Sequence, residues 1–129
     1  MTERVVIVEG VRTPIGRFGG TLKNVSSGFL AAHVITALLN KTGVHPEQVE
    51  EVILGEVRQT TESSNVARVA TIRAKLPVEV PAFTINRLCA SGMQAIASGV
   101  QQIQSGHAQI VIAGGTESMS NAPIYLRNS

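Results

Sequence analysis

Four short apolar runs recur along this chain and alternate with segments of helical character. The runs occupy residues 5–8, 52–57, 82–85 and 109–113, and β-branched side chains are frequent in each. Continuous apolar runs of this length are typical of strands buried on both faces. Caps and apolar spacing predict helices from Ser26 or Ser27 to about Lys41, over 65–75 and over 91–105. Because strands that alternate with helices build layers, the sequence predicts an α/β fold with a mostly parallel, mixed sheet and helices on both faces.

The predicted helix at 91–105 has an unusual surface. It carries no Lys, Arg, Asp or Glu, and its apolar stripe consists of Met93, Ile96, Val100 and Ile103. A surface helix carries charges on its outer face, so a helix without them is typical of burial on all sides. A sheet covers only one side. We therefore expect a further layer, either from additional chain (a C-terminal half) or from a second subunit in a homo-oligomer.

The only cysteine, Cys89, stands where the run 82–85 gives way to this helix. Unpaired N–H groups and the positive end of the helix dipole lie at a helix start, and both favour the nucleophilic thiolate. The small neighbours Ser91, Gly92 and Ala95 leave room for a substrate carbonyl. From the residues alone two interpretations stay open. Cys89 is either a reactive nucleophile or a buried small hydrophobic residue, as most free cysteines are.

Composition excludes several classes of protein. The length of 129 residues suits one domain, and 43% hydrophobic with 16% charged residues is a globular composition. The net charge is only +2 and Lys and Arg form no run, so we expect no nucleic-acid binding. A single cysteine and the lack of a Cys/His cluster predict neither a disulfide nor a metal site and favour a reducing cytoplasm. Glu9 interrupts the first run, which is too short for a signal peptide or a membrane span.

Four segments, which follow one another along the chain in the order of the family, resemble the thiolases. The segment Asn86-x-x-Cys89-x-Ser91-Gly92-Met93-Gln94-Ala95 is similar to the signature around the acyl-carrying cysteine of thiolases. Residues 8–20 resemble the family's opening strand and loop, 52–57 its second strand, and 113–120 its Gly-Gly-x-Glu-Ser-Met-Ser turn. The resemblance covers essentially all of residues 1–129. It implies one incomplete domain, the N-terminal half of a layered thiolase-like fold.

Later family motifs are not found in these residues. They are a Cys-x-Gly-Gly-Gly segment, a Gly-His-Pro segment, an Asn-Glu-Ala-Phe segment and the loop domain that holds most coenzyme A contacts. His33, His45 and His107 match none of them, and each is expected to be solvated or packed. Because the family's activating histidine and second cysteine belong to those motifs, we expect the 129-residue chain alone to be inactive.

The resemblance implies an acetyl-CoA C-acetyltransferase, which forms acetoacetyl-CoA and coenzyme A from two acetyl-CoA molecules or runs the reverse cleavage. Cys89 attacks the thioester and carries the acyl group, and its backbone N–H helps to stabilise the tetrahedral oxyanion. The coenzyme A thioester is the substrate, and no cofactor or metal is implied. Around the nucleophile, Asn86 is expected to hold the turn or fix a partner subunit, and Gly92 to allow close backbone approach.

Two further side chains and three alternatives remain. Glu117 is expected to accept hydrogen bonds from local backbone N–H groups, and Met119 to line the acyl pocket, touch a subunit or fill the core.

One alternative function is that of a longer-chain 3-ketoacyl-CoA thiolase of fatty-acid degradation. Another, of a different class, is a non-catalytic fragment that folds or self-associates without turnover. A phosphate loop at Gly114-Gly115 is disfavoured, because no GxGxxG or GxxxxGK[ST] pattern follows.

Overall fold

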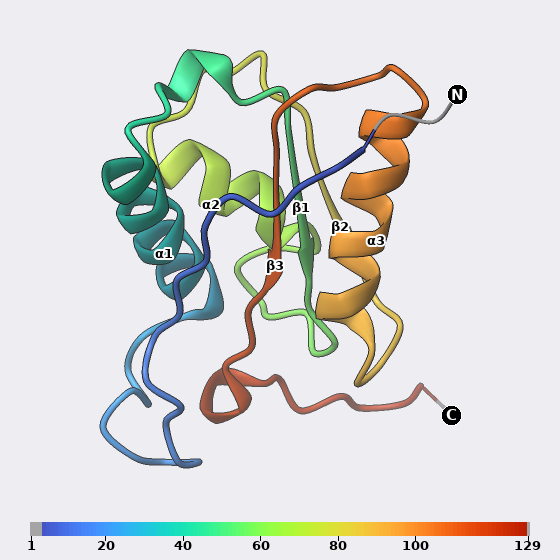
Figure 1. The fold of residues 1–129 in the computed structure, drawn as a ribbon. Helices are drawn as coiled ribbons and strands as arrows, with labels where there is room; N and C mark the ends of the chain where they lie inside the picture. Colours follow the sequence, from blue (N-terminus) through green and yellow to red (C-terminus); the bar gives the residue numbers. More distant parts are fainter. Residues whose placement is uncertain (1–3, 129) are drawn as a thin grey trace.

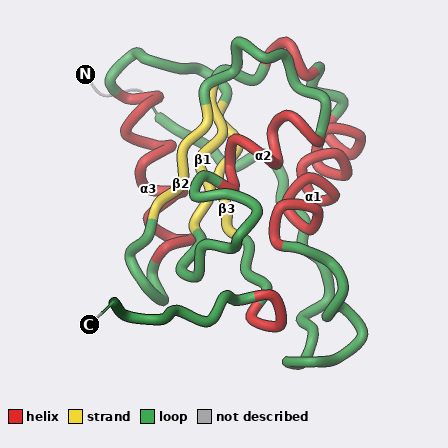
Figure 2. The backbone as a smooth tube through the Cα atoms, turned by 180° about the vertical axis from the view of Figure 1, so that it is seen from behind, coloured by secondary structure: helices red, strands yellow, loops and turns green. Residues whose placement is uncertain are grey.

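The computed structural model describes residues 4–128 and shows a layered α/β arrangement. Strands β1 (Glu51–Gly55), β2 (Ala82–Ile85) and β3 (Val111–Gly115) form a parallel sheet in the order β2-β1-β3. The sheet lies between helix α3 (Ser91–Gln104) on one face and helices α1 (Ser27–Thr42) and α2 (Val66–Arg73) on the other (Figures 1 and 2). Short 3-10 helices η1 (Pro46–Gln48) and η2 (Met119–Asn121) lie in the connections. The predicted fold class is confirmed.

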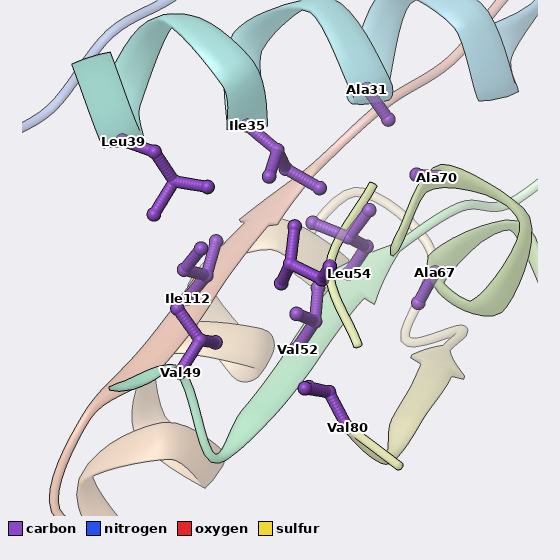
Figure 3. Packing of buried hydrophobic residues seen from close by; sticks show 11 residues of the cluster. Ala31, Ile35, Leu39, Val49, Val52, Leu54, Ala67, Ala70, Val80 and Ile112 are labelled. Atoms are coloured by element: carbon purple, nitrogen blue, oxygen red, sulfur yellow. The ribbon is translucent and has the colours of Figure 1, made fainter. Parts of the chain in front are cut away.

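The hydrophobic core fills the space between the sheet and helices α1 and α2. Figure 3 shows Ile35 and Leu39 of α1 reaching toward Val52 and Ile112 of the sheet. All five residues of β1 are buried, because this central strand has a neighbour on each side and a helix layer on each face. Side chains alternate along a strand, so Ile53 points to the opposite face, toward α3.

Helix α3 turns its small residues toward the sheet. Ser91, Ala95 and Gly99 are its buried positions, whereas Met93 is 77% and Ile96 41% exposed. The small residues allow a close approach, since a Cβ atom at Gly99 would lie 3.2 Å from Val111 Cγ1. Within residues 4–128 Met93 and Ile96 are therefore uncovered, whereas Val100 and Ile103 are partly buried, and the expected second layer is not supplied by this part of the chain.

The predicted strand at residues 5–8 is not formed. Residues 4–11 have no regular secondary structure, and Val6, Ile7 and Val8 are exposed. A strand requires a partner for its backbone N–H and C=O groups, and no strand of the described residues pairs with this segment. The described sheet consequently has three strands, and its pairings are all parallel.

The cap predicted for the first helix is present, and α2 has a cap that the sequence analysis did not predict. Ser26 accepts a hydrogen bond from the Phe29 N–H at the start of α1, which ends at Gly43 with φ of 73°. Asn65 caps α2 by accepting from the Arg68 N–H, and α2 ends at Arg73, two residues before the predicted Lys75. Among residues 4–128, no helix combines the length and apolar character that a membrane crossing needs.

The close contact between β1 and α3 predicts an asymmetric response to two glycine substitutions. A Cβ atom at Gly55 would lie 2.7 Å from the Ser91 carbonyl carbon and 2.9 Å from the Gly92 nitrogen. At Gly114 the nearest atom, Leu54 Cδ2, would be 3.9 Å away. We expect Gly55→Ala to lower the free energy of unfolding in urea by about 1–3 kcal/mol or more. Gly114→Ala is the matched control and should cost much less; equal losses would contradict the predicted contact.

Candidate active site

Cys89 lies in the turn between β2 and α3, at the edge of the sheet where the three parallel strands end (Figure 1). Its side chain is free and exposed. Ala90 is the N-cap residue of α3, so Cys89 directly precedes the helix. Within this part of the chain, Cys89 is therefore not a buried hydrophobic residue, and its sulfur is open to a reactant.

The turn before Cys89 has an unusual backbone conformation at Leu88. Its φ of 50° places a branched, non-glycine residue in the left-handed region. This conformation costs energy, so it persists only where surrounding contacts hold it. The Leu88 N–H donates to Asn86 Oδ1 at 3.0 Å, and Ser91 Oγ donates to the Leu88 carbonyl at 2.6 Å. Ser91 Oγ also accepts from the Arg87 N–H at 2.7 Å. Asn86 thus holds this turn through its amide, as the sequence predicted.

The backbone around Cys89 offers a donor for negative charge. The N–H groups of Ala90, Ser91 and Gln94 are paired with carbonyls of Arg87, Leu88 and Ala90, respectively. In the described residues the Cys89 N–H has no hydrogen-bond partner. An unpaired N–H before a helix can stabilise an oxyanion that forms beside the sulfur.

Two glycines bring strand ends against the first turn of α3. The Gly55 position leaves no room for a side chain beside Ser91, and a Cβ atom at Gly115 would lie 3.6 Å from Gly92 Cα. Among the described residues, the missing side chain of Gly92 is not what permits this approach, because a Cβ atom there would meet no described atom within 4 Å. The role expected of Gly92 stays a prediction. The close approach is made by the strands β1 and β3, which form the base on which α3 begins.

Glu117 makes hydrogen bonds to backbone N–H groups, but these groups are not local. Its Oε1 accepts from the Val57 N–H at 2.9 Å, and its Oε2 accepts from the Arg58 N–H at 3.2 Å. These residues follow β1 and precede Glu117 by 60 and 59 positions. The predicted bond type is confirmed, whereas the predicted local partners are wrong, because parallel strands bring their carboxyl ends together.

Glu56, between Gly55 and Val57, was not singled out by sequence reasoning. Its side chain is 2% exposed, and neither carboxyl oxygen has a hydrogen-bond partner among the described residues. Burial raises the pKa of Glu56; the adjacent Ser27 opposes this, and the charges of Glu117 and Glu62 add to it. The only sequence signal was one carboxylate inside an otherwise apolar run.

The histidines lie away from Cys89. His45 precedes η1, at the amino end of β1, and His107 follows the far end of α3 and contacts Ser105. His33 is an exposed residue of α1. Within residues 4–128, no cluster of three or more His, Cys, Asp or Glu side chains could hold a metal ion.

A cavity of about 450 Å³ lies between the loop at 11–18, α1 and residues 115–120. Met119 lines it and is half exposed. Cys89 is not among the lining residues, so this cavity is separate from the candidate nucleophile.

Comparisons with known proteins find relatives along nearly all of this chain. A family model described as "Thiolase, N-terminal domain" matches residues 5–129. The acetyl-CoA acetyltransferase of Syntrophomonas wolfei is 48% identical over 129 residues, which are 100% of this chain and 33% of that protein. That of Cupriavidus necator is 49% identical over 97% of this chain and 32% of its own length. The crystal structure of the Bacillus anthracis acetyl-CoA acetyltransferase is similar with a TM-score of 0.87 and 49% identity, covering 91% of this chain and 30% of that one. The chain thus spans about a third of the length of these relatives.

The buried carboxyl of Glu56 predicts a pH-dependent stability. Its pKa is raised in the folded chain, so between the ordinary glutamate pKa and the folded value the folded chain holds a proton that the unfolded chain has lost. Stability from this group is present at low pH and is lost as pH rises through the folded pKa. We expect Glu56→Gln, which cannot ionise, to gain stability relative to the native chain as the pH rises above the ordinary glutamate pKa of about 4.5.

The measurement is urea unfolding of both proteins as a function of pH. Exposed Glu79, substituted as Glu79→Gln, is the control and should leave the pH dependence unchanged. A constant stability difference between Glu56→Gln and the native chain at all pH values would contradict the assignment.

Proposed function

The chain belongs to the thiolase family, and from that membership we propose that it forms part of an acetyl-CoA C-acetyltransferase. The observation that carries this proposal is the exposed sulfur of Cys89, placed directly before α3 at the edge where the three strands end. Curated relatives named acetyl-CoA acetyltransferase support acetyl-CoA as the substrate.

The proposed reaction has two covalent steps. The Cys89 thiolate attacks the carbonyl carbon of acetyl-CoA, coenzyme A leaves and takes up a proton, and an acetyl thioester forms on Sγ. The unpaired Cys89 N–H lies at the start of the helix and would stabilise the tetrahedral oxyanion. A second acetyl-CoA then loses the proton beside its carbonyl, and the carbanion attacks the acetylated cysteine. The new carbon–carbon bond gives acetoacetyl-CoA, and the bond from carbon to Sγ breaks.

Proton transfer in this scheme needs groups that these 129 residues do not contain. The family resemblance assigns it to a histidine and a second cysteine of other segments, and the described histidines lie away from the nucleophile. We therefore propose that turnover requires the further chain that the longer relatives possess. The exposed Met93 and Ile96 are proposed to be covered by that chain or by a second subunit, and the free thiol suits a cytoplasmic location.

Two alternatives make different predictions. A longer-chain 3-ketoacyl-CoA thiolase would cleave medium-chain 3-ketoacyl-CoA with a higher kcat/KM than acetoacetyl-CoA. This alternative stays open because a relative from Staphylococcus epidermidis is named a probable acetyl-CoA acyltransferase, a name that does not specify the acyl chain. A non-catalytic fragment would fold or self-associate without turnover. Cleavage of acetoacetyl-CoA by the purified 129-residue chain, at the rate of a complete thiolase, would overturn our proposal that it needs further chain.

The acyl-enzyme itself is the direct test. We expect intact-mass and peptide analysis of a complete enzyme containing these residues to place one acetyl group on Cys89 after incubation with acetyl-CoA. Cys89→Ala should abolish the label and lower kcat roughly 10⁴-fold or more, because removal of a nucleophile removes the covalent route. Gln101→Ala, an exposed change on α3 remote from the turn, is the control and should keep both. A label on another residue, or a fully active Cys89→Ala enzyme, would reject the proposal.

A further inference from the structure

The turn that carries Cys89 is connected by hydrogen bonds to Glu117, which follows β3. The Glu117 carboxylate accepts from two consecutive backbone N–H groups, those of Val57 and Arg58, at 2.9 and 3.2 Å. Each N–H has its own carboxylate oxygen, whereas Gln would place an NH2 donor opposite one of the two N–H groups and lose that bond. Glu117 therefore fixes the position of the segment that follows β1.

Val57 links this segment to Asn86, which follows the neighbouring strand β2. Its carbonyl accepts from Asn86 Nδ2 at 3.2 Å, while Asn86 Oδ1 accepts from the Leu88 N–H at 3.0 Å. The amide nitrogen of Asn86 thus bonds to the segment after β1, and its amide oxygen bonds to the turn that precedes Cys89. A continuous path of hydrogen bonds thus leads from Glu117 through Val57 and Asn86 to the residue before the nucleophile.

We propose that Glu117 is a positioning residue for Cys89, which acts through Val57 and Asn86. This role rests on the proposed function of Cys89 as the acyl carrier. Leu88 holds a φ of 50°, a conformation that persists in a non-glycine residue only where surrounding contacts impose it. Without a fixed Val57, Asn86 would lose its anchor and Leu88 would relax toward an ordinary conformation. The sulfur and the N–H of Cys89 would then leave their positions before α3.

A purely structural role for Glu117 can be separated from a positioning role, because the chain contains a matched carboxylate. Glu50 precedes β1, and its Oε2 accepts from the Gln109 N–H at 3.2 Å, just before β3. It joins the same two strands by the same type of bond at the opposite, amino end of the sheet. Glu50→Ala, which removes the single bond that Glu50 accepts, is therefore the control for lost stability without a change near Cys89.

The readout is the rate at which iodoacetamide alkylates the folded chain. Cys89 is the only cysteine, so the rate reports one sulfur. We expect Glu117→Gln to slow alkylation about threefold or more, the scale of one lost hydrogen bond, and Glu50→Ala to leave the rate unchanged. Loss of the Glu117 charge would by itself favour the thiolate and speed the reaction, so slower alkylation separates position from charge. Thermal unfolding of each variant confirms that the folded state is compared.

A double-mutant cycle tests the proposed path. Asn86→Ala removes both bonds of the amide and should slow alkylation at least as much as Glu117→Gln. Because Glu117 acts through Asn86, the double variant should be no slower than Asn86→Ala alone. Amide hydrogen exchange should accelerate at Val57, Arg58 and Leu88 in Glu117→Gln, and at Gln109 in Glu50→Ala. An unchanged or faster alkylation rate in Glu117→Gln, equal slowing in both glutamate variants, or additive effects in the double variant would overturn the proposal.

Alkylation requires no acyl-CoA, so this experiment and the test of the proposed function fail independently. Slow alkylation of Glu117→Gln together with no acetyl label on Cys89 in the complete enzyme would reject the acyl-carrier function and keep the positional link. An acetyl label on Cys89 together with native alkylation of Glu117→Gln would reject the positioning role and keep the function.

Discussion

The ends of β1 and β3 touch the first turn of α3 at backbone distance, and the geometry around Cys89 depends on that contact. Gly55 and Gly115 have no side chains, so the strand ends can approach Ser91 and Gly92 directly. Ser91, fixed in this contact, bonds through its hydroxyl to Arg87 and Leu88, the two residues that precede Cys89. The position of the sulfur is thus set by rigid elements rather than by a free loop, which is what a reacting group requires.

The face of the sheet that packs on α1 and α2 and the carboxyl edge of the sheet contribute differently to the structure. Between the sheet and helices α1 and α2, apolar side chains such as Ile35, Val52 and Ile112 form the core and provide the non-directional part of the stability. At the carboxyl edge, directional bonds from Glu117, Asn86 and Ser91 fix the backbone. The core determines that the layers associate, and the polar contacts determine where the turn with Cys89 lies.

Sequence patterns predicted the elements that local chemistry encodes. The cap at Ser26, the helix start after Asn65 and the turn role of Asn86 follow from short-range hydrogen bonding and were found in the structure. The run at 5–8 has the composition of a strand, but composition does not provide a pairing partner, and the segment is unpaired in the described sheet. The partners of Glu117 and the burial of Glu56 arise from tertiary packing between segments far apart in the chain, so no local pattern could reveal them.

Helix α3 connects the completion of the fold with the completion of the active site. Its small residues pack on the sheet, and its exposed apolar side begins at Met93, one turn beyond Cys89. Such a surface is costly in water, and burial of Met93 would bring the covering residues beside the sulfur. In the proposed enzyme, a layer that removes this surface from solvent would also be placed to supply the proton-transfer groups that the described residues do not bring near Cys89. On that proposal, the same apolar contact would stabilise the fold and assemble the chemistry beside the proposed nucleophile.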